Sequence, residues 1–175
     1  LLFRTFSLYL PPDRARQLAR QPAGQAMAAE NRELSVMFCD LRGFTSVSEG
    51  LTPDALRELL NAYFSLATEV VHAHGGTLDK FIGDAVMAFW GAPLAQPDHA
   101  RRAVQAALAL AASAEPLNAH LASRGLPPVR FGIGVATGVV CVGDLGSQLR
   151  RSYTAVGDAA NLAARLEALT RETGV

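Results

Sequence analysis

The segment LSVMFCDLRGFTS, residues 34–46, carries the most structural information in this 175-residue chain. Its first six residues form a short apolar run that ends at Asp40, which is typical of a buried strand. The residues that follow form a polar turn around Gly43, and such a turn can lead into a helix. The segment therefore predicts a buried strand whose end is followed at once by a carboxylate and a glycine turn.

Helical and strand patterns alternate through the rest of the chain. Thr52 supplies an N-cap hydroxyl before a proline, and apolar residues at helical spacing continue until Gly75. A second helix opens at Pro97 and runs toward Ala114, and a third covers residues 158–169. Strand patterns cover residues 77–81, 85–90, 129–137, 139–142 and 153–156, with hairpin turns at 82–84 and Gly138 and a loop at 144–151. This order predicts an α+β sandwich with antiparallel hairpins and with helices on one face of the sheet.

Composition limits the number of domains and the kinds of partner. Half of the residues are apolar, which is enough to bury one core at this length. Sixteen basic residues balance sixteen acidic ones, which argues against a nucleic-acid partner held by bulk electrostatics. Cys39 and Cys141 lie among apolar neighbours and are predicted to be reduced core thiols of an intracellular protein. Residues 1–31 are interpreted as a linker with a short helix at 13–20, outside the core, and residues 32–175 as the folded domain.

The chain contains a single lysine. Fifteen of its sixteen basic residues are arginine, and Lys80 is the exception. A compact ammonium and a forked guanidinium are not interchangeable, so one retained lysine suggests a position that requires the ammonium. The alternative is that Lys80 is a surface residue without a specific task.

Two aspartates follow predicted strands. Asp40 ends the first strand and Asp84 lies at the tip of the 82–84 hairpin. Mg²⁺ takes oxygen ligands and uses few protein carboxylates together with substrate phosphates, so the two aspartates are candidate ligands. The neighbouring turn 43–46 would present successive backbone N–H groups, which can bind phosphate oxygens. The alternative is that each aspartate only caps a turn, which aspartate often does.

Several other site classes find no support in the sequence. There is no P-loop, no HExxH helix and no GxSxG elbow, and the four histidines lack metal-ligand spacing. Gly132, Gly134 and Gly138 only approximate a dinucleotide-binding fingerprint and are interpreted as close-packed strand positions. On the last helix, Asn161 and Arg165 share a face at i and i+4. Arg165 either meets an anion among its apolar neighbours or belongs to a solvated stripe with Glu167 and Arg171.

Three blocks of this sequence resemble one family. FCDLRGFTSVSE from Phe38, LDKFIGDAVMAFWGAP from Leu78 and YTAVGDAANLAARLE from Tyr153 are similar to the three signature blocks of class III adenylyl/guanylyl cyclase catalytic domains. The resemblance extends through most of residues 33–170. It implies a ferredoxin-like α/β sandwich that works as a head-to-tail homodimer with active sites at the interface.

The resemblance also implies roles for individual residues. Asp40 and Asp84 correspond to the metal-binding aspartates and the Leu41 carbonyl to a third ligand, for two Mg²⁺ or Mn²⁺ ions in each active site. The other corresponding positions are Gly43, Phe44, Thr45 and Arg150 for phosphates, Lys80 and Thr154 for the base, Asn161 for the ribose and Arg165 for the transition state. An ammonium and a hydroxyl suit adenine, so the implied substrate is ATP rather than GTP.

The implied reaction is attack of the ribose 3′-oxygen on the α-phosphate, giving 3′,5′-cyclic AMP and pyrophosphate. Family members carry a further phosphate-binding lysine beyond Arg165, so the domain is expected to be truncated at its C-terminus. The segment YLPP at residues 9–12 resembles a linker to an upstream sensor or membrane domain. The catalytic domain would then be cytoplasmic, tethered to the inner membrane. The rivals are a catalytically silent regulatory dimerisation domain and, with less support, a guanylyl or diguanylate cyclase.

Overall fold

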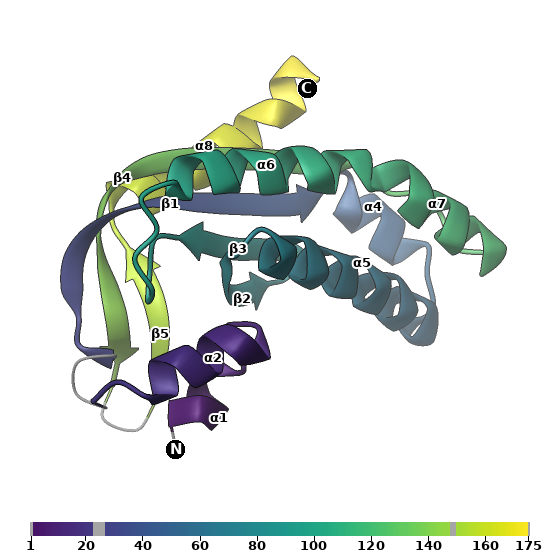
Figure 1. The fold of residues 1–175 in the computed structure, drawn as a ribbon. Helices are drawn as coiled ribbons and strands as arrows, with labels where there is room; N and C mark the ends of the chain where they lie inside the picture. Colours follow the sequence, from purple (N-terminus) through teal and green to yellow (C-terminus); the bar gives the residue numbers. More distant parts are fainter. Residues whose placement is uncertain (1, 23–26, 148–149, 175) are drawn as a thin grey trace.

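A five-stranded antiparallel sheet forms the centre of the molecule (Figure 1). The computed structural model describes residues 2–22, 27–147 and 150–174. The strands lie in the order β2-β3-β1-β4-β5. Their bounds are Glu30–Leu41 for β1, Thr77–Ile82 for β2, Ala85–Trp90 for β3, Phe131–Gly146 for β4 and Arg151–Val156 for β5. The predicted α+β sandwich is therefore confirmed.

Helices cover both faces of this sheet. One core contains residues of α5 (Pro53–Ala73), α6 (His99–Ala112) and α7 (Ala114–Ser123). The other contains residues of α1 (Leu2–Phe6), α2 (Pro12–Ala19) and α8 (Asp158–Thr173). The short helix α4 (Phe44–Glu49) follows β1. The prediction of helices on one face was wrong, because alternate residues of the central strand β1 are buried against different helices.

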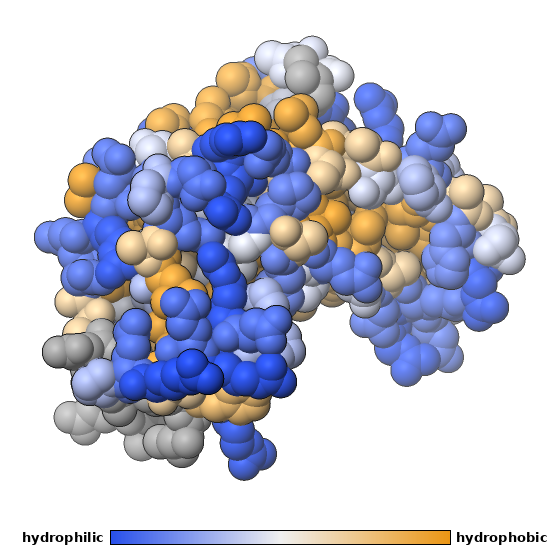
Figure 2. Space-filling model, viewed as in Figure 1, coloured by the Kyte–Doolittle hydropathy of each residue, from blue (hydrophilic) through white to orange (hydrophobic). Residues whose placement is uncertain are grey.

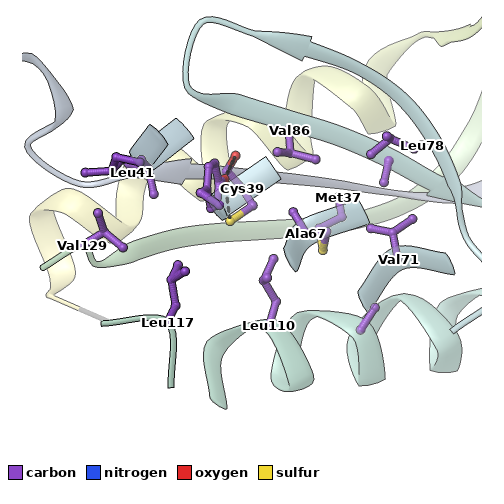
Figure 3. Packing of buried hydrophobic residues seen from close by; sticks show 14 of the residues in the cluster. Met37, Cys39, Leu41, Ala67, Val71, Leu78, Val86, Leu110, Leu117 and Val129 are labelled. Carbon is purple, nitrogen blue, oxygen red and sulfur yellow. Dashed lines mark hydrogen bonds between the residues drawn. The ribbon is translucent and has the colours of Figure 1, made fainter. Parts of the chain in front are cut away.

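The core under α5 and α6 shows this burial directly (Figure 3). Met37, Cys39 and Leu41 of β1 point toward the same face, where they join residues of α5 and α6 such as Ala67 and Leu110. Both cysteines are free, and burial raises the pKa of the Cys39 thiol to about 12. Cys39 is therefore an unreactive packing residue at the strand end that precedes Asp40.

The fourth strand is longer than the sequence pattern indicated. The predicted hairpin at Gly138 does not exist, because β4 runs without interruption from Phe131 to Gly146 and includes part of the predicted 144–151 loop. Gly138 pairs with Leu34 in the ladder between β1 and β4. Its missing side chain instead leaves room for Ala159 of α8. The close-packed interpretation of this glycine is confirmed and its turn interpretation is wrong.

The N-terminal segment is part of the core. Phe6, Leu10 and Leu18 are fully buried, so the expectation that residues 1–31 lie outside the core was wrong. Phe6 contacts Tyr153 of β5 edge-on at 5.5 Å between ring centroids. The carbonyl of Tyr9 accepts a hydrogen bond of 2.9 Å from the amide of Leu78 in β2. These contacts were not predictable from a segment that alternates short apolar and arginine-rich pieces.

Apolar side chains also remain at the surface (Figure 2). The largest exposed ones on α6 and α8 are Val104, Leu108, Leu162, Leu166 and Leu169. Among the residues that the structure describes, no helix has both the length and the apolar character needed to cross a bilayer.

Candidate active site

The end of β1 meets the turn between β2 and β3. The amide of Leu41 donates a hydrogen bond of 3.0 Å to Asp84 Oδ2. Asp84 lies in the two-residue turn after Gly83, whose φ of 61° favours glycine. Asp40 directly precedes Leu41 and is 7% exposed. Two aspartates 44 positions apart in sequence therefore belong to one end of the sheet.

Asp40 lies against two side chains from the last turns of α8. Its Oδ2 accepts a hydrogen bond of 2.5 Å from Arg171 Nη2. Its Oδ1 and Glu167 Oε1 are buried without a hydrogen-bond partner among the described residues. Burial, and secondly the Asp40 carboxylate, raise the pKa of Glu167 to about 7. Gly132 makes room for this pair, since a Cβ there would lie 2.5 Å from Glu167 Oε1 and 3.3 Å from Asp40 Oδ1.

A glycine in the left-handed conformation follows the end of β1 that carries the candidate metal ligand Asp40. Gly43 has a φ of 66°, which a residue with a side chain rarely adopts, and it precedes the first residue of α4. No side chain caps this helix, so its first amides, including those of Phe44 and Thr45, have no side-chain acceptor at the cap. The predicted turn next to Asp40 is confirmed, whereas phosphate binding by its amides stays a prediction.

Lys80 and Thr154 approach each other across the curved sheet. They lie on β2 and β5, which are the two edges in the strand order, yet both contact Asp79. Thr154 Oγ1 donates a hydrogen bond of 2.6 Å to Asp79 Oδ2, and Lys80 Nζ lies 3.6 Å from Asp79 Oδ1. Burial raises the pKa of Asp79, while the Thr154 hydroxyl and the Lys80 ammonium oppose that shift.

Asn161 and Arg165 line a surface cavity of about 550 Å³ between α8 and β4. Both are exposed and lie one helical turn apart, as their spacing predicted. Ala159, Ala160 and Ala163 pack the opposite side of this helix into the core, which explains why the two polar side chains face outward.

These residues form three separate groups in one chain. Within the described residues, the lining of the Asn161 and Arg165 cavity includes none of Asp40, Asp84, Lys80 or Thr154. Arg150 is exposed in the connection between β4 and β5, at the opposite end of β4 from Phe131, which pairs with Leu41. The single chain therefore brings together the aspartates and, separately, the lysine and threonine, but it does not assemble all the predicted residues.

Three residues that contact these groups were missed at the level of sequence. Asp79 was not singled out because neighbours on a regular strand point to opposite faces. The pairing of β2 with β3 shifts between Leu78 and Lys80, and this bulge contains Asp79. Glu167 and Arg171 appeared only in the alternative of a solvated stripe with Arg165, but Glu167 is 7% exposed and Arg171 donates a hydrogen bond to Asp40. For Asp79, the available signal was an acidic residue beside the only lysine. For Glu167, it was the presence of glycines on β4 opposite α8.

Comparison with known proteins gives consistent matches. Residues 27–175 match the family model described as Adenylate and Guanylate cyclase catalytic domain. Adenylate cyclase 1 of Rhizobium meliloti (strain 1021) is 40% identical over 170 residues, which cover 97% of this chain and 26% of that protein. Adenylate cyclase of Anabaena cylindrica is 35% identical over 84% of this chain and 29% of that protein. The chain thus spans between a quarter and a third of the length of these relatives.

A solved structure agrees with the sequence match. The adenylyl cyclase CyaB from P. aeruginosa shares 37% identity and a TM-score of 0.78, over 81% of this chain and 74% of that one. The family match covers residues 27–175, which include the whole sheet. It also includes the end of β1 and the β2–β3 hairpin, which are joined by the hydrogen bond between Leu41 and Asp84. The chain belongs to the adenylate and guanylate cyclase catalytic domain family.

Proposed function

We propose that this chain is the catalytic domain of an adenylate cyclase, which converts ATP to 3′,5′-cyclic AMP and pyrophosphate. The observation that carries the proposal is the hydrogen bond between the Leu41 amide and Asp84, because it holds two distant carboxylates at one end of the sheet. The names of the relatives from Rhizobium meliloti and Anabaena cylindrica support the same activity.

The aspartates suit a divalent cation. Asp40 Oδ1 is buried without a hydrogen-bond partner among the described residues, and a bound cation would satisfy this oxygen. Asp40, Asp84 and the carbonyl of Leu41 offer the oxygen ligands that Mg²⁺ or Mn²⁺ prefers. Two such ions, when bound, would stabilise negative charge on the triphosphate and on the ribose 3′-oxygen. Arg171 would have to share or release Asp40 when a cation binds.

The remaining residues bind and orient the nucleotide. The amides of Gly43, Phe44 and Thr45 would hold phosphate oxygens, with Arg150 as a further cation for the triphosphate. Asn161 would orient the ribose so that its 3′-oxygen lies in line with the α-phosphorus. Arg165 would balance the charge that develops on the α-phosphoryl oxygens during attack.

The active unit is proposed to be a homodimer. One chain places Asn161 and Arg165 in a cavity that Asp40 and Asp84 do not line. A symmetric second copy can supply the missing group to each site, so that two composite sites form at the interface. Exposed leucines beside these residues on α8, Leu162 and Leu166, provide apolar surface for such contact.

A guanylyl cyclase is the second candidate among enzymes. The guanylyl cyclase Cya2 has a similar fold, with 41% identity, a TM-score of 0.77 and coverage of 81% of this chain and 72% of that one. Overall similarity therefore does not select the base, and the choice rests on Lys80 and Thr154. A silent regulatory domain is disfavoured because both aspartates and Arg165 are present.

Product analysis tests the proposal. The purified protein is incubated with ATP or GTP and with Mg²⁺ or Mn²⁺, and the products are identified by chromatography and mass spectrometry. We expect cyclic AMP and pyrophosphate from the wild type and no product from Asp40→Ala or Asp84→Ala. The matched control is Asp54→Ala, which removes an exposed carboxylate at the start of α5. Cyclic GMP as the main product, or activity that persists without both aspartates, contradicts the proposal.

A further inference from the structure

Asp79 is a buried carboxylate that the proposed mechanism does not use. Its side chain is 1% exposed, and it lies in the β-bulge of β2. Three donors from two strands surround it: the hydroxyl of Thr154 at 2.6 Å, the amide of Ala155 at 3.4 Å and the ammonium of Lys80 at 3.6 Å. Oδ1 makes no hydrogen bond among the described residues, so the nearby Lys80 ammonium compensates the buried charge electrostatically.

The position of the protons follows from this geometry. Asp79 Oδ2 faces both the Ala155 amide and the Thr154 hydroxyl. An amide can only donate, so Oδ2 must be an acceptor, and a proton on the carboxyl group would have to reside on Oδ1. The Thr154 hydroxyl therefore donates its single proton to Oδ2, and only its lone pairs remain for a ligand. The other oxygen keeps the Lys80 ammonium nearby, and Lys80 remains 42% exposed and can donate to a ligand.

We propose that Asp79 is a positioning residue that fixes base selectivity by making Thr154 an obligatory acceptor beside the donor Lys80. This inference rests on the proposed function of the site. Adenine presents a donor at its 6-amino group and an acceptor at N1, which match an accepting Thr154 and a donating Lys80. Guanine presents the opposite pair, an acceptor at O6 and a donor at N1. To accommodate guanine, Thr154 would have to rotate its proton away from Asp79 and leave that buried acceptor unsatisfied.

A purely structural role is the competing explanation. Asp79 joins β2 to β5, so its removal would lower stability whether or not it directs Thr154. The two explanations differ in one measurable quantity. Only a positioning role changes the ratio of kcat/KM for ATP to kcat/KM for GTP, because a structural role reduces both values together.

The test compares variants of Asp79 and Thr154. Asp79→Ala frees the hydroxyl proton of Thr154, so we expect the ATP-to-GTP ratio to fall about tenfold or more. Asp79→Asn is the matched control, because its carbonyl oxygen can still accept from Thr154 and Ala155. We expect Asp79→Asn to keep the ratio within about threefold of wild type while its KM values rise, since Lys80 loses its charged neighbour. Asp79→Val, which also has no acceptor for the Thr154 hydroxyl, replaces Asp79→Ala if the alanine variant does not fold, with the same expected loss of selectivity.

A double-mutant cycle shows whether Asp79 acts through Thr154. Thr154→Val removes the hydroxyl, so adding Asp79→Ala to it should leave the ratio unchanged. Competition binding of ATP and GTP is measured in parallel on every variant, which separates this inference from the proposed reaction. A protein that binds ATP selectively but forms no cyclic product contradicts the proposed function alone. The inference is overturned if the wild type does not discriminate the bases, if Asp79→Ala lowers the melting temperature without changing the ratio, or if the two substitutions change the ratio independently.

Discussion

Gly134 is the position where a single methyl group should separate α8 from the sheet. A Cβ there would lie 2.2 Å from the carbonyl oxygen of Ala163 and 2.3 Å from the amide nitrogen of Glu167. Both atoms belong to the backbone of α8, so no change of rotamer can relieve the overlap. At Gly138, on the same face of β4, the nearest atom is the Ala159 Cβ at 3.2 Å.

The size of the effect follows from these distances. Ordinary contacts between nonbonded heavy atoms lie at about 3.5 Å, so α8 would have to retreat by about 1 Å near its centre. Overpacking of a close-packed interior costs about 1–3 kcal/mol and more when backbone must move. We therefore expect Gly134→Ala to lower the free energy of unfolding by at least about 3 kcal/mol. Gly138→Ala should change it by less than about 1 kcal/mol, because only a small adjustment is needed.

Urea denaturation followed by far-ultraviolet circular dichroism measures both values. Gly138→Ala is the matched control, because it carries the same Gly-to-Ala change in the conformational entropy of the unfolded chain. A Gly134→Ala variant that is as stable as Gly138→Ala would refute the packing argument. Its structure would then have to place α8 farther from β4 than the distances at Gly134 indicate.

Three further predictions concern the site and the core. Glu167 has a raised pKa of about 7, so its contribution to stability is present at low pH and is lost as the pH rises from its unfolded value of 4.5 through 7. Glu167→Gln should therefore be more stable than wild type by roughly 1 kcal/mol or more at about pH 8, and as stable as wild type near pH 4.5. Chemical denaturation in EDTA measures both values. Equal stability of the two proteins at about pH 8 would contradict the raised pKa of Glu167. Lys80→Glu with Thr154→Cys should shift kcat/KM toward GTP in product assays, and retained ATP selectivity would count against the base pocket. Phe6→Ala should lower the free energy of unfolding by about 3–5 kcal/mol in the same denaturation experiment, because it empties a fully buried position beside Tyr153. A loss below about 1 kcal/mol would show that the N-terminal segment does not contribute to the core.

Local signals were enough to predict the strand before Asp40 and the hairpin that carries Asp84. A short apolar run and a glycine turn are properties of neighbouring residues, and they do not depend on the rest of the fold. The glycines of β4 were interpreted as close-packed positions, and the contacts that a Cβ would make at Gly132 and Gly134 confirm this. The resemblance to the cyclase family added roles that these patterns could not supply.

Long-range packing explains what the sequence did not reveal. Gly138 was interpreted as a turn, since a glycine between two apolar runs has the same pattern in a hairpin and in a strand beneath a helix. The contact of Asp79 with Thr154 depends on a bulge and on the curvature that brings β2 to β5. The sequence shows only an acidic residue beside the single lysine, so the folded structure was needed to place Asp79 against Thr154.

In the proposed dimer, each copy of helix α8 would contribute residues to both active sites. Its outer face carries Asn161 and Arg165, while its last turns place Glu167 and Arg171 against Asp40. In a dimer with composite sites, one copy of α8 would serve the nucleotide in one active site and the metal-binding end of the other. Because Gly134 lets this helix pack directly on β4, a displacement of α8 would disturb both active sites at once. The close packing that stabilises the fold is therefore also the physical connection between the two proposed sites.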